Sequence, residues 1–257
     1  MNGPPLLQTD GLTVSIGERR LTAGLDWAIR PGECWALLGL NGAGKTSLLH
    51  TLAGLRAPAA GEVRLDGTPL PALNRRRIAR RIGILFQDYQ DLFPGTVFET
   101  AMAGRLPHLA PWRWESPADR ERVHQSLTEV GLDGFAARAV NTLSGGERRR
   151  LALATVLAQA PALYLLDEPV NHLDLHHQIT MLETVRRRTA DGAAAVLVLH
   201  DLNLAARFCD RACLLIGDGE ARLGPTEILF TPDALSRLYG HPIRTVAGPS
   251  GPFYYPA

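Results

Sequence analysis

A glycine-rich stretch near the start of the chain has the composition and spacing of a loop that binds phosphate groups. It reads Gly39-Leu40-Asn41-Gly42-Ala43-Gly44-Lys45-Thr46, a glycine and four residues followed by Gly-Lys-Thr. Glycines let the backbone wrap closely around an anion, so that successive N–H groups point at it. Lys45 supplies charge for the β- and γ-phosphates, and the Thr46 hydroxyl is a ligand for Mg²⁺. A glycine-rich turn formed by chance is the alternative, and the motif alone leaves ATPases, GTPases and kinases open.

Two acidic residues follow an apolar run in the second half of the chain. Leu163–Leu166 precedes Asp167 and Glu168. An aspartate at such a strand end beside a phosphate loop supplies a carboxylate to Mg²⁺. The adjacent Glu168 can accept a proton from an attacking water molecule. The alternative, a strand that simply ends at the surface, explains one acid better than two, so the pair indicates hydrolysis of ATP.

A second anion-binding helix start is predicted about 100 residues after the first. In Leu143-Ser144-Gly145-Gly146-Glu147, Ser144 and Glu147 have the spacing of a capping box, and an apolar-periodic helix follows. An ordinary capped helix is therefore the alternative. The doubled glycine argues against it, because each glycine costs a helix about 1 kcal/mol relative to alanine. What two glycines provide is bare backbone N–H groups at the positive end of a helix.

These motifs, in this order, resemble those of ABC-type ATPases, and the resemblance runs from Leu12 to about Tyr239. LSGGE is the signature of that family, and it stands at the expected distance before LYLLDEP. The resemblance implies that Gln87 connects two lobes and touches Mg²⁺ or the lytic water. It implies that Asn171–Asp174 crosses a dimer interface and that His200 contacts the γ-phosphate.

The resemblance also implies an ATP site that two copies of the chain complete together. In the family, the signature of one subunit closes over the ATP held by the phosphate loop of the other. The cofactors would be ATP and Mg²⁺, and two ATP molecules would lie head to tail between the subunits. Catalytic roles fall to Lys45, Gln87, Glu168 and His200, and Mg²⁺ contacts to Thr46, Gln87 and Asp167. ATP contacts fall to Gly39–Thr46, Ser47 and Ile16 and, from the second copy, to Ser144, Gly145, Gly146 and Asp174.

The position expected to hold the adenine base departs from the family pattern. The family usually places an aromatic side chain near the end of the first strand, where the ring stacks on adenine. In this sequence the matching position is Ile16. We therefore expect the base to rest on an aliphatic side chain, with weaker stacking and weaker base selectivity.

Stretches outside the motifs resemble ATPases of iron–siderophore, haem and cobalamin importers. They include Thr96–His108, the segment LDEPVNHLDLHHQ and the segment HDLNLAARFCDR. This group implies permease subunits in the membrane, a substrate-binding protein, and a peripheral position on the cytoplasmic face of the inner membrane. The alternatives are the ATPase of another ABC transporter, including an exporter, and a soluble ABC ATPase acting on ribosomes or DNA. Leu92–Trp114 is expected to face the permease, with Trp112 and Trp114 as contacts or, alternatively, packed within the helical lobe.

The elements that must position these residues follow an α/β pattern. Apolar runs at Cys34–Leu40, Ile82–Phe86, Ala162–Leu166 and Ala193–Leu199 predict buried strands of a mostly parallel sheet. The first thirty residues predict a small antiparallel sheet, with turns at Asp10-Gly11, Gly17-Glu18 and Pro31-Gly32. Helices are expected at Thr46–Leu55, Ser116–Val130 and Thr231–Gly240, and a hairpin at Arg211–Leu223. We expect one nucleotide-binding domain, with a core at 1–87 and 160–224, a helical subdomain at 88–159 and a tail at 225–257.

Composition excludes several other classes of protein. The chain has 257 residues, 46% hydrophobic and 21% charged, with a formal net charge of +1, so no strongly basic face for nucleic acid is expected. No signal peptide and no membrane span are expected. Three cysteines, Cys34, Cys209 and Cys213, predict buried thiols in a reducing compartment. The arginines of Arg75–Arg81 predict a solvated helix face, with a lipid contact as the alternative.

Overall fold

The computed structural model describes residues 3–87, 95–110, 112–248 and 251–257, and a six-stranded sheet lies at its centre. The strand order is β10-β9-β3-β8-β7-β6. The neighbours from β9 to β6 pair in parallel, and β10 pairs antiparallel with β9 at one edge. The bounds are β3 (Cys34–Gly39), β6 (Ile82–Leu85), β7 (Leu163–Asp167), β8 (Ala194–Val198), β9 (Arg211–Gly217) and β10 (Glu220–Pro225). The predicted parallel sheet is confirmed.

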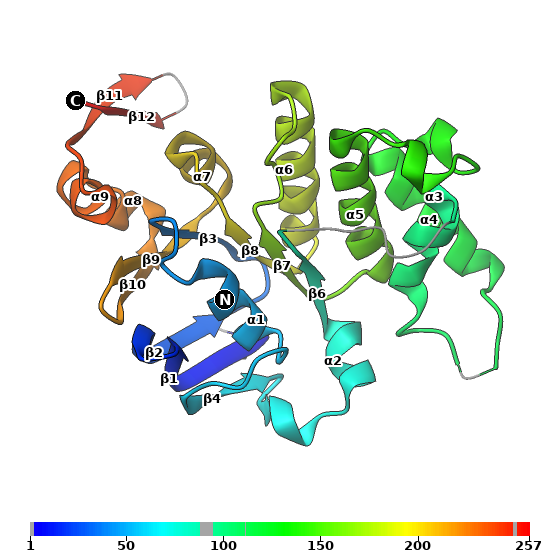
Figure 1. Ribbon diagram of the computed structural model, residues 1–257, viewed down its shortest axis with the longest axis horizontal. Coiled ribbons are helices and arrows are strands. Elements are labelled where there is room, and N and C mark those ends of the chain that lie inside the picture. The colour runs from blue at the N-terminus through cyan, green and yellow to red at the C-terminus, as the bar shows by residue number, and fades with distance from the viewer. Residues whose placement is uncertain (1–2, 88–94, 111, 249–250) are drawn as a thin grey trace.

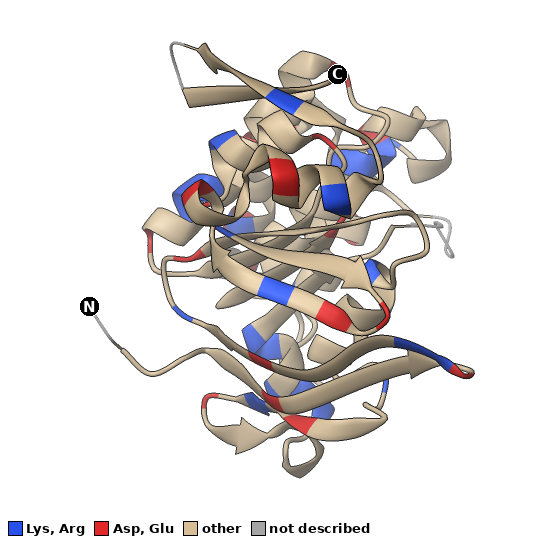
Figure 2. Ribbon diagram, turned by 90° about the vertical axis from the view of Figure 1, so that its left-hand side faces the viewer, with Lys and Arg blue, Asp and Glu red and all other residues tan. Residues whose placement is uncertain are grey.

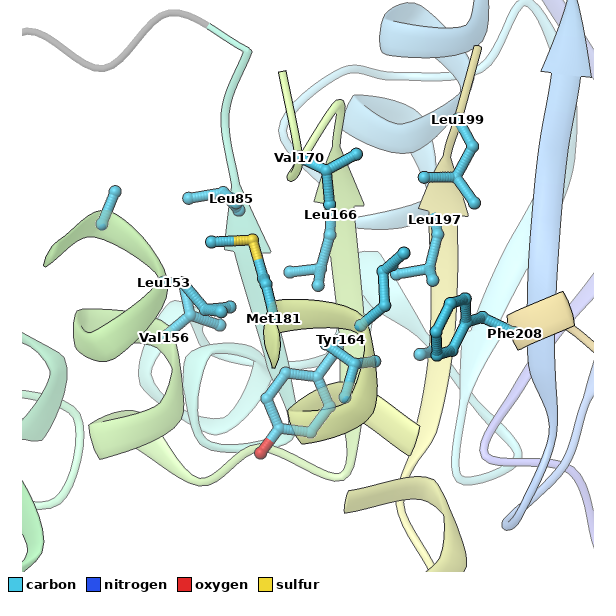
Figure 3. Close-up of a cluster of buried hydrophobic side chains, with 14 of the residues drawn as sticks. Leu85, Leu153, Val156, Tyr164, Leu166, Val170, Met181, Leu197, Leu199 and Phe208 are labelled. Carbon is cyan, nitrogen blue, oxygen red and sulfur yellow. The ribbon is translucent and has the colours of Figure 1, made fainter. Parts of the chain in front are cut away.

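The apolar runs form strands because both faces of the sheet are covered. All six residues of β3 are buried, and alternate side chains belong to different cores. Ala36 and Leu38 pack with the helices α5 (Gly145–Gln159), α6 (Leu175–Ala190) and α7 (Leu202–Phe208). Figure 3 shows this core, with Tyr164 and Leu166 of β7 against Met181 of α6 and with Leu197 beside Phe208. Trp35 and Leu37 face the other core, which includes α1 (Lys45–Leu52).

A four-stranded antiparallel sheet covers that second core. Its order is β2-β1-β4-β5, with bounds Arg19–Ile29, Leu7–Ile16, Ala60–Leu65 and Thr68–Pro69. The predicted turn at Asp10-Gly11 is wrong, because the two residues form a bulge inside the continuous strand β1. The bulge brings backbone close to backbone, since a Cβ on Gly61 would lie 2.3 Å from the Gly11 carbonyl oxygen. The pair Asp-Gly marks a kink in the chain, but here it does not reverse its direction.

The helical segment between β6 and β7 stands to one side of the sheet (Figure 1, green). It contains α3 (Val97–Met102), α4 (Pro117–Glu129) and α5. Ser116 caps α4 in a capping box with Asp119, as the sequence predicts. The alternative that Trp112 and Trp114 pack within this lobe is wrong, because their exposed fractions are 101% and 90%. Part of the predicted permease-facing stretch Leu92–Trp114, namely residues 92–94 and 111, lies outside the described residues.

The two helices after β10 pack against β9 and β10, at one edge of the central sheet. They are α8 (Thr226–Leu229) and α9 (Pro232–Tyr239), and a separate hairpin of β11 (Ile243–Gly248) and β12 (Gly251–Pro256) follows them. Figure 1 shows this hairpin in red above α7 and α9. The sequence predicts α9 and its end at Gly240, which has a φ of +65°, but it gives no indication of the hairpin. The described residues of the expected C-terminal tail therefore form two helices and a hairpin.

Charged side chains of both signs are distributed over the molecule. Lys and Arg are interspersed with Asp and Glu in the view of Figure 2. The basic run forms α2 (Arg75–Arg81) as predicted, but its arginines are not simply solvated. Arg76 and Arg80 both donate to the Pro107 carbonyl oxygen, at 2.9 and 2.7 Å, and so tie α2 to the helical segment. None of the helices in the described part of the chain combines the length and the apolar character that crossing a bilayer requires.

Candidate active site

The polar ends of four neighbouring strands meet at one edge of the central sheet. The loops that follow β3, β6, β7 and β8 lie together there because the strands are parallel, which is where open α/β sheets bind ligands. A cavity of about 590 Å³ opens at this edge. It is lined by Ile16, Asn41, Gly42, Gly44, Lys45, Thr46, Ser47, Gln87, Glu168, Asn171 and His200. The structure therefore gathers residues from all the motifs that were expected to act within one chain.

The phosphate loop has a backbone shape that requires glycine. Gly42 and Gly44 have φ angles of +75° and +98°, in the left-handed region. A Cβ on Gly44 would lie 2.5 Å from Cδ1 of Leu21. Gly44 caps α1 without a side-chain hydrogen bond, so the first amides of the helix have no side-chain acceptor. Such a helix start suits an anion.

Three residues of the phosphate loop that were expected to contact ATP do not line the cavity. Gly39 ends β3, and a Cβ there would lie 3.0 Å from the Leu215 carbonyl oxygen. Ala43 is buried and donates its backbone N–H to the Leu40 carbonyl oxygen at 3.0 Å, while the side chain of Leu40 is half exposed. These residues shape the loop, and their side chains do not line the cavity.

Lys45 lies at the base of the loop and is only 6% exposed. Its Nζ donates to the carbonyl oxygens of Gly39 (2.8 Å) and Leu40 (3.1 Å). Burial lowers the pKa of this amine, and the nearby carboxylates of Glu168 and Asp167 partly oppose that shift. A buried amine next to two acids is well placed to exchange carbonyl oxygens for the oxygens of a phosphate.

Glu168 has polar partners on both carboxylate oxygens. His200 Nε2 lies 2.7 Å from Oε1, and Gln87 Nε2 donates to Oε2 at 3.3 Å. Asn171 Nδ2 also donates to Oε2. Glu168 itself has a φ of +50°, which is costly for a residue with a side chain and is found most often at functional sites. Three polar side chains thus fix one carboxylate at the mouth of the phosphate loop.

Asp167 is the neighbouring acid, and its environment differs sharply. The residue is 1% exposed, and within the described residues neither carboxylate oxygen has a hydrogen-bond partner at ordinary geometry. Burial raises the pKa of this carboxyl, although the adjacent Thr46 hydroxyl and the side chains of His50 and Arg149 lower it. A buried carboxylate without a donor costs free energy unless a cation or a donor approaches it. Its surroundings therefore suit a cation that arrives with a ligand.

The signature residues do not line this cavity. Ser144 caps α5, and its backbone N–H donates to Glu147 Oε2 at 2.7 Å, which completes the predicted capping box. Ser144 and Gly145 are exposed, and a Cβ on Gly145 would meet nothing within 4 Å. Asp174 is also exposed and caps α6 by accepting from the His177 backbone N–H at 2.9 Å. Nothing within the described chain thus requires glycine at position 145, and its assignment to a second copy stays a prediction.

Two residues of the site were missed by the sequence reasoning. Asn171 belongs to a segment that was expected to cross a dimer interface, yet its side chain bonds Glu168 in the same chain. Arg149, on α5, is 8% exposed and donates to backbone carbonyls of both catalytic loops. It precedes the buried Leu153 and Val156 by four and seven residues, which is the spacing of one helix face. That spacing could have shown that Arg149, and not Arg148 or Arg150, lies on the buried face of the helix.

Comparison with known families assigns the chain. The family model described as ABC transporter matches residues 22–171, which include the phosphate loop, the signature and the Asp-Glu pair. This chain belongs to the ABC transporter family. As a member of that family it is an ATP-binding subunit that hydrolyses ATP.

Relatives with curated names cover most of this ABC ATPase. The hemin import ATP-binding protein HmuV of Nocardia farcinica is 43% identical over 233 residues, which are 90% of this chain and 80% of that protein. HmuV of Streptomyces coelicolor is 41% identical, over 96% of this chain and 88% of its own length. The cobalamin import ATP-binding protein BtuD of Halobacterium salinarum is 38% identical over 91% of this chain, and that match covers 58% of BtuD.

Solved structures share the fold of this ABC ATPase. A chain from a metal-chelate type ABC transporter in an inward-facing conformation superimposes with a TM-score of 0.84, over 98% of this chain and 97% of that chain, at 24% identity. An ATP-binding cassette in a dimeric post-hydrolysis state with ADP and phosphate superimposes with a TM-score of 0.73 over 85% of this chain and 98% of that chain, at 28% identity. The predicted fold class is confirmed.

Proposed function

We propose that this chain is the ATP-hydrolysing subunit of an importer for haem, cobalamin or a related metal chelate. The named relatives are hemin and cobalamin import ATP-binding proteins at about 40% identity over most of the chain. The single observation that carries the ATPase assignment is Glu168, fixed by His200, Gln87 and Asn171 at the mouth of the phosphate loop. An exporter of the bacterial Atm1 family shares the fold, with a TM-score of 0.76 and 24% identity, so the import assignment depends on the sequence relatives.

Binding of ATP uses the loop amides, Lys45 and Ser47. The triphosphate takes the N–H groups of Gly42–Thr46 as donors, and Lys45 moves from the loop carbonyls to the β- and γ-phosphates. The base lies against Ile16, whose side chain is 48% exposed and lines the same cavity. This binding orients the γ-phosphate toward Glu168.

Hydrolysis needs a water molecule in line with the γ-phosphate. Glu168 Oε1 or Oε2 accepts a proton from that water as its oxygen bonds to the γ-phosphorus. The bond from the γ-phosphorus to the β–γ bridging oxygen breaks, and ADP leaves with the bonding electron pair. His200 and Gln87 keep the carboxylate in place and lie within reach of the transferred phosphate.

The residues present also fit Mg²⁺. The buried carboxylate of Asp167 and the Thr46 hydroxyl lie beside each other at the phosphate loop, and Gln87 lines the same cavity. Oxygen ligands of this kind are those that Mg²⁺ takes when phosphates complete its coordination. In the described part of the chain no group of three or more His, Cys, Asp or Glu side chains forms a protein-only metal site. When bound, Mg²⁺ would neutralise charge on the β- and γ-phosphates.

A second copy of the chain completes the site. Ser144, Gly145, Gly146 and Asp174 are exposed or half-buried, and they lie outside the cavity of their own chain. The permease subunits then bind on the helical side, where Trp112 and Trp114 are exposed. The pair of ATPases is a peripheral assembly on the cytoplasmic face of the membrane, fed indirectly by a substrate-binding protein.

The decisive experiment replaces Glu168 by Gln in the full-length chain. We expect ATP hydrolysis to fall at least about 100-fold, because the base is lost while the shape is kept. ATP binding should stay within about twofold of wild type, and ATP-bound pairs should accumulate in size-exclusion chromatography. Rapid turnover by this variant would exclude Glu168 as the base.

The substrate class is tested in proteoliposomes that contain the ATPase and its permease. Uptake of haem or cobalamin that depends on ATP on the ATPase side would support import of a metal chelate. ATP-driven movement of substrate in the opposite direction would overturn it.

A further inference from the structure

Arg149 connects three parts of the molecule through one side chain. It lies in the first turns of α5, five residues after Ser144, and is 8% exposed. Its guanidinium donates to the Phe86 carbonyl oxygen (2.6 Å) and the Gln87 carbonyl oxygen (3.1 Å), at the end of β6. It also donates to the carbonyl oxygens of Asp167, Glu168 (2.6 Å) and Pro169 (3.4 Å), after β7.

These contacts make Arg149 rigid and difficult to replace. Arginine has five N–H donors in a fixed planar fork, and here they meet backbone carbonyls of two different loops. Lysine has three donors on a single nitrogen atom and cannot reach both loops in the same geometry. Because the carbonyls are partly buried, any that lost its donor would carry a desolvation penalty. The positions of α5 and of the two loops are thus tied together.

Under the proposed function, the start of α5 and the two loops that Arg149 binds act in different ATP sites. The loops present Gln87 and Glu168 to the ATP bound by the same chain. The start of α5 presents Ser144–Gly146 away from that cavity, toward the ATP held by the partner copy. Figure 1 shows α5 on the β6 side of the central sheet, and the hydrogen bonds of Arg149 join it to the loops after β6 and β7. A shift of α5 on closing over one ATP therefore shifts the catalytic loops of the other site.

We propose that Arg149 is a positioning residue that couples the two ATP sites of a pair. It transmits the position of the signature helix to Gln87 and Glu168 of its own chain, and it holds that helix in place for the partner's ATP. The inference rests on the proposed function, since it requires Glu168 to act in its own chain and Ser144–Gly146 to act in the partner.

The test uses mixed pairs of full-length chains, assembled with the permease subunits and purified through two different affinity tags. One chain carries Glu168→Gln and is silent, so turnover comes only from the wild-type chain, which receives its signature from the silent chain. Adding Arg149→Lys to the silent chain leaves the active chain unaltered. In a second pair, Arg149→Lys is placed in the active chain instead.

We expect both placements to lower kcat about tenfold, as a displacement of catalytic groups of the order of 1 Å can do. Full activity with Arg149→Lys in the silent chain would overturn the coupling, whether or not the other placement is impaired. The matched control is Arg150→Lys in the silent chain. Arg150 is the next residue of the same helix, but it donates to the carbonyls of Val130 and Gly131, both at 2.9 Å, away from the catalytic loops.

Folding and the proposed function are checked separately. The ATP affinity of each variant chain, measured alone, should stay within about twofold of wild type, because the carbonyls that Arg149 binds lie on the loops after β6 and β7 and not on the phosphate loop. If Arg149→Lys fails this check, Arg149→Gln takes its place in both pairs, and equal activity of wild-type and variant pairs again overturns the coupling. Turnover by a pair in which both chains carry Glu168→Gln would instead overturn the proposed role of Glu168.

Discussion

Asp167 and Glu168 are adjacent acids whose environments assign them different chemistry. Glu168 receives hydrogen bonds from side chains on three loops and stays accessible from the cavity. Asp167 is buried against the phosphate loop without a donor at ordinary geometry in the described chain. The surroundings of Glu168 suit an acid–base group, and those of Asp167 suit a ligand for a cation, so the two roles can lie side by side.

The first prediction concerns the stability of the nucleotide-free chain. Burial raises the pKa of Asp167 above its ordinary value of 3.8, so the folded state favours the neutral carboxyl. The stability that this group contributes is present below pH 3.8 and is lost as the pH rises through the folded-state pKa. At neutral pH the ionised group is therefore destabilising, and Asp167→Asn should raise the melting temperature by about 2–4 °C per kcal/mol relieved.

The same substitution should remove the extra stabilisation that Mg²⁺ with ATP gives the wild-type chain. Thermal unfolding with and without Mg²⁺ and ATP, at neutral pH, measures both effects. Asp133→Asn is the control, because Asp133 is exposed and far from the loop in sequence. A lower melting temperature for nucleotide-free Asp167→Asn would contradict the assignment of a buried charge.

The second prediction concerns Ile16 and the base of the nucleotide. An aromatic ring in this half-exposed position could stack on adenine, and such pairs contribute about 0.5–1.5 kcal/mol beyond area burial. Ile16→Tyr should therefore tighten ATP binding about two- to tenfold. Titration with a fluorescent ATP analogue measures the change. Ile228→Tyr is the control, since Ile228 is exposed on α8 and does not line the cavity.

At the scale of single elements, the C-terminal hairpin depends on the segment that carries His200. The Asn203 side chain accepts from the Tyr254 backbone N–H at 2.8 Å and donates to the Tyr254 carbonyl oxygen at 3.1 Å. Tyr254 is 7% exposed and donates its hydroxyl to the Phe230 carbonyl oxygen at 3.1 Å. A two-stranded hairpin is marginally stable by itself, so this docking keeps β11 and β12 paired.

The third prediction follows from that docking. Asn203→Ala removes both hydrogen bonds, each contributing about 1 kcal/mol. Hydrogen exchange measured by mass spectrometry should then accelerate in peptides covering β11 and β12. The control is Phe253→Ser, which alters a half-exposed side chain of the same strand and leaves the Asn203 contact intact. Unchanged exchange in Asn203→Ala would show that other contacts hold the hairpin.

Helices and strands could be predicted where the hydrophobic pattern of the sequence matches the way the element is buried in the fold. The buried strands β7 and β8 lie within one residue of their expected positions, because parallel strands covered on both faces are continuous apolar runs. The hairpin was missed because its strands contain glycine and proline and are mostly exposed, so they carry no alternating pattern. Arg149 was missed because its partners Phe86 and Gln87 are distant in sequence and are brought close only by the fold. Asn171 was missed although Glu168 is a near neighbour in sequence, because its segment was expected to cross a dimer interface.

At the scale of the whole molecule, the proposed function divides the ATP site into two halves that face different neighbours. The cavity gathers the phosphate loop with the ends of β6, β7 and β8. The start of α5 exposes a glycine whose Cβ position is open, in a helix that would be more stable with alanine there. Because nothing in the described part of the chain requires glycine there, we predict a close approach by something outside the chain.

The fourth prediction tests this division directly. Ser144→Arg places a long charged side chain at the start of α5, where it would clash with the γ-phosphate side of a partner's ATP. Binding of ATP to the isolated chain should remain within about twofold of wild type, because Ser144 does not line its own cavity. ATP-dependent pairing should be lost even in the Glu168→Gln background, as sedimentation velocity with excess ATP would show. Ser236→Arg is the control, since Ser236 lies on α9, apart from the cavity lining. Normal pairing by Ser144→Arg would contradict the assignment of the signature to the partner's ATP.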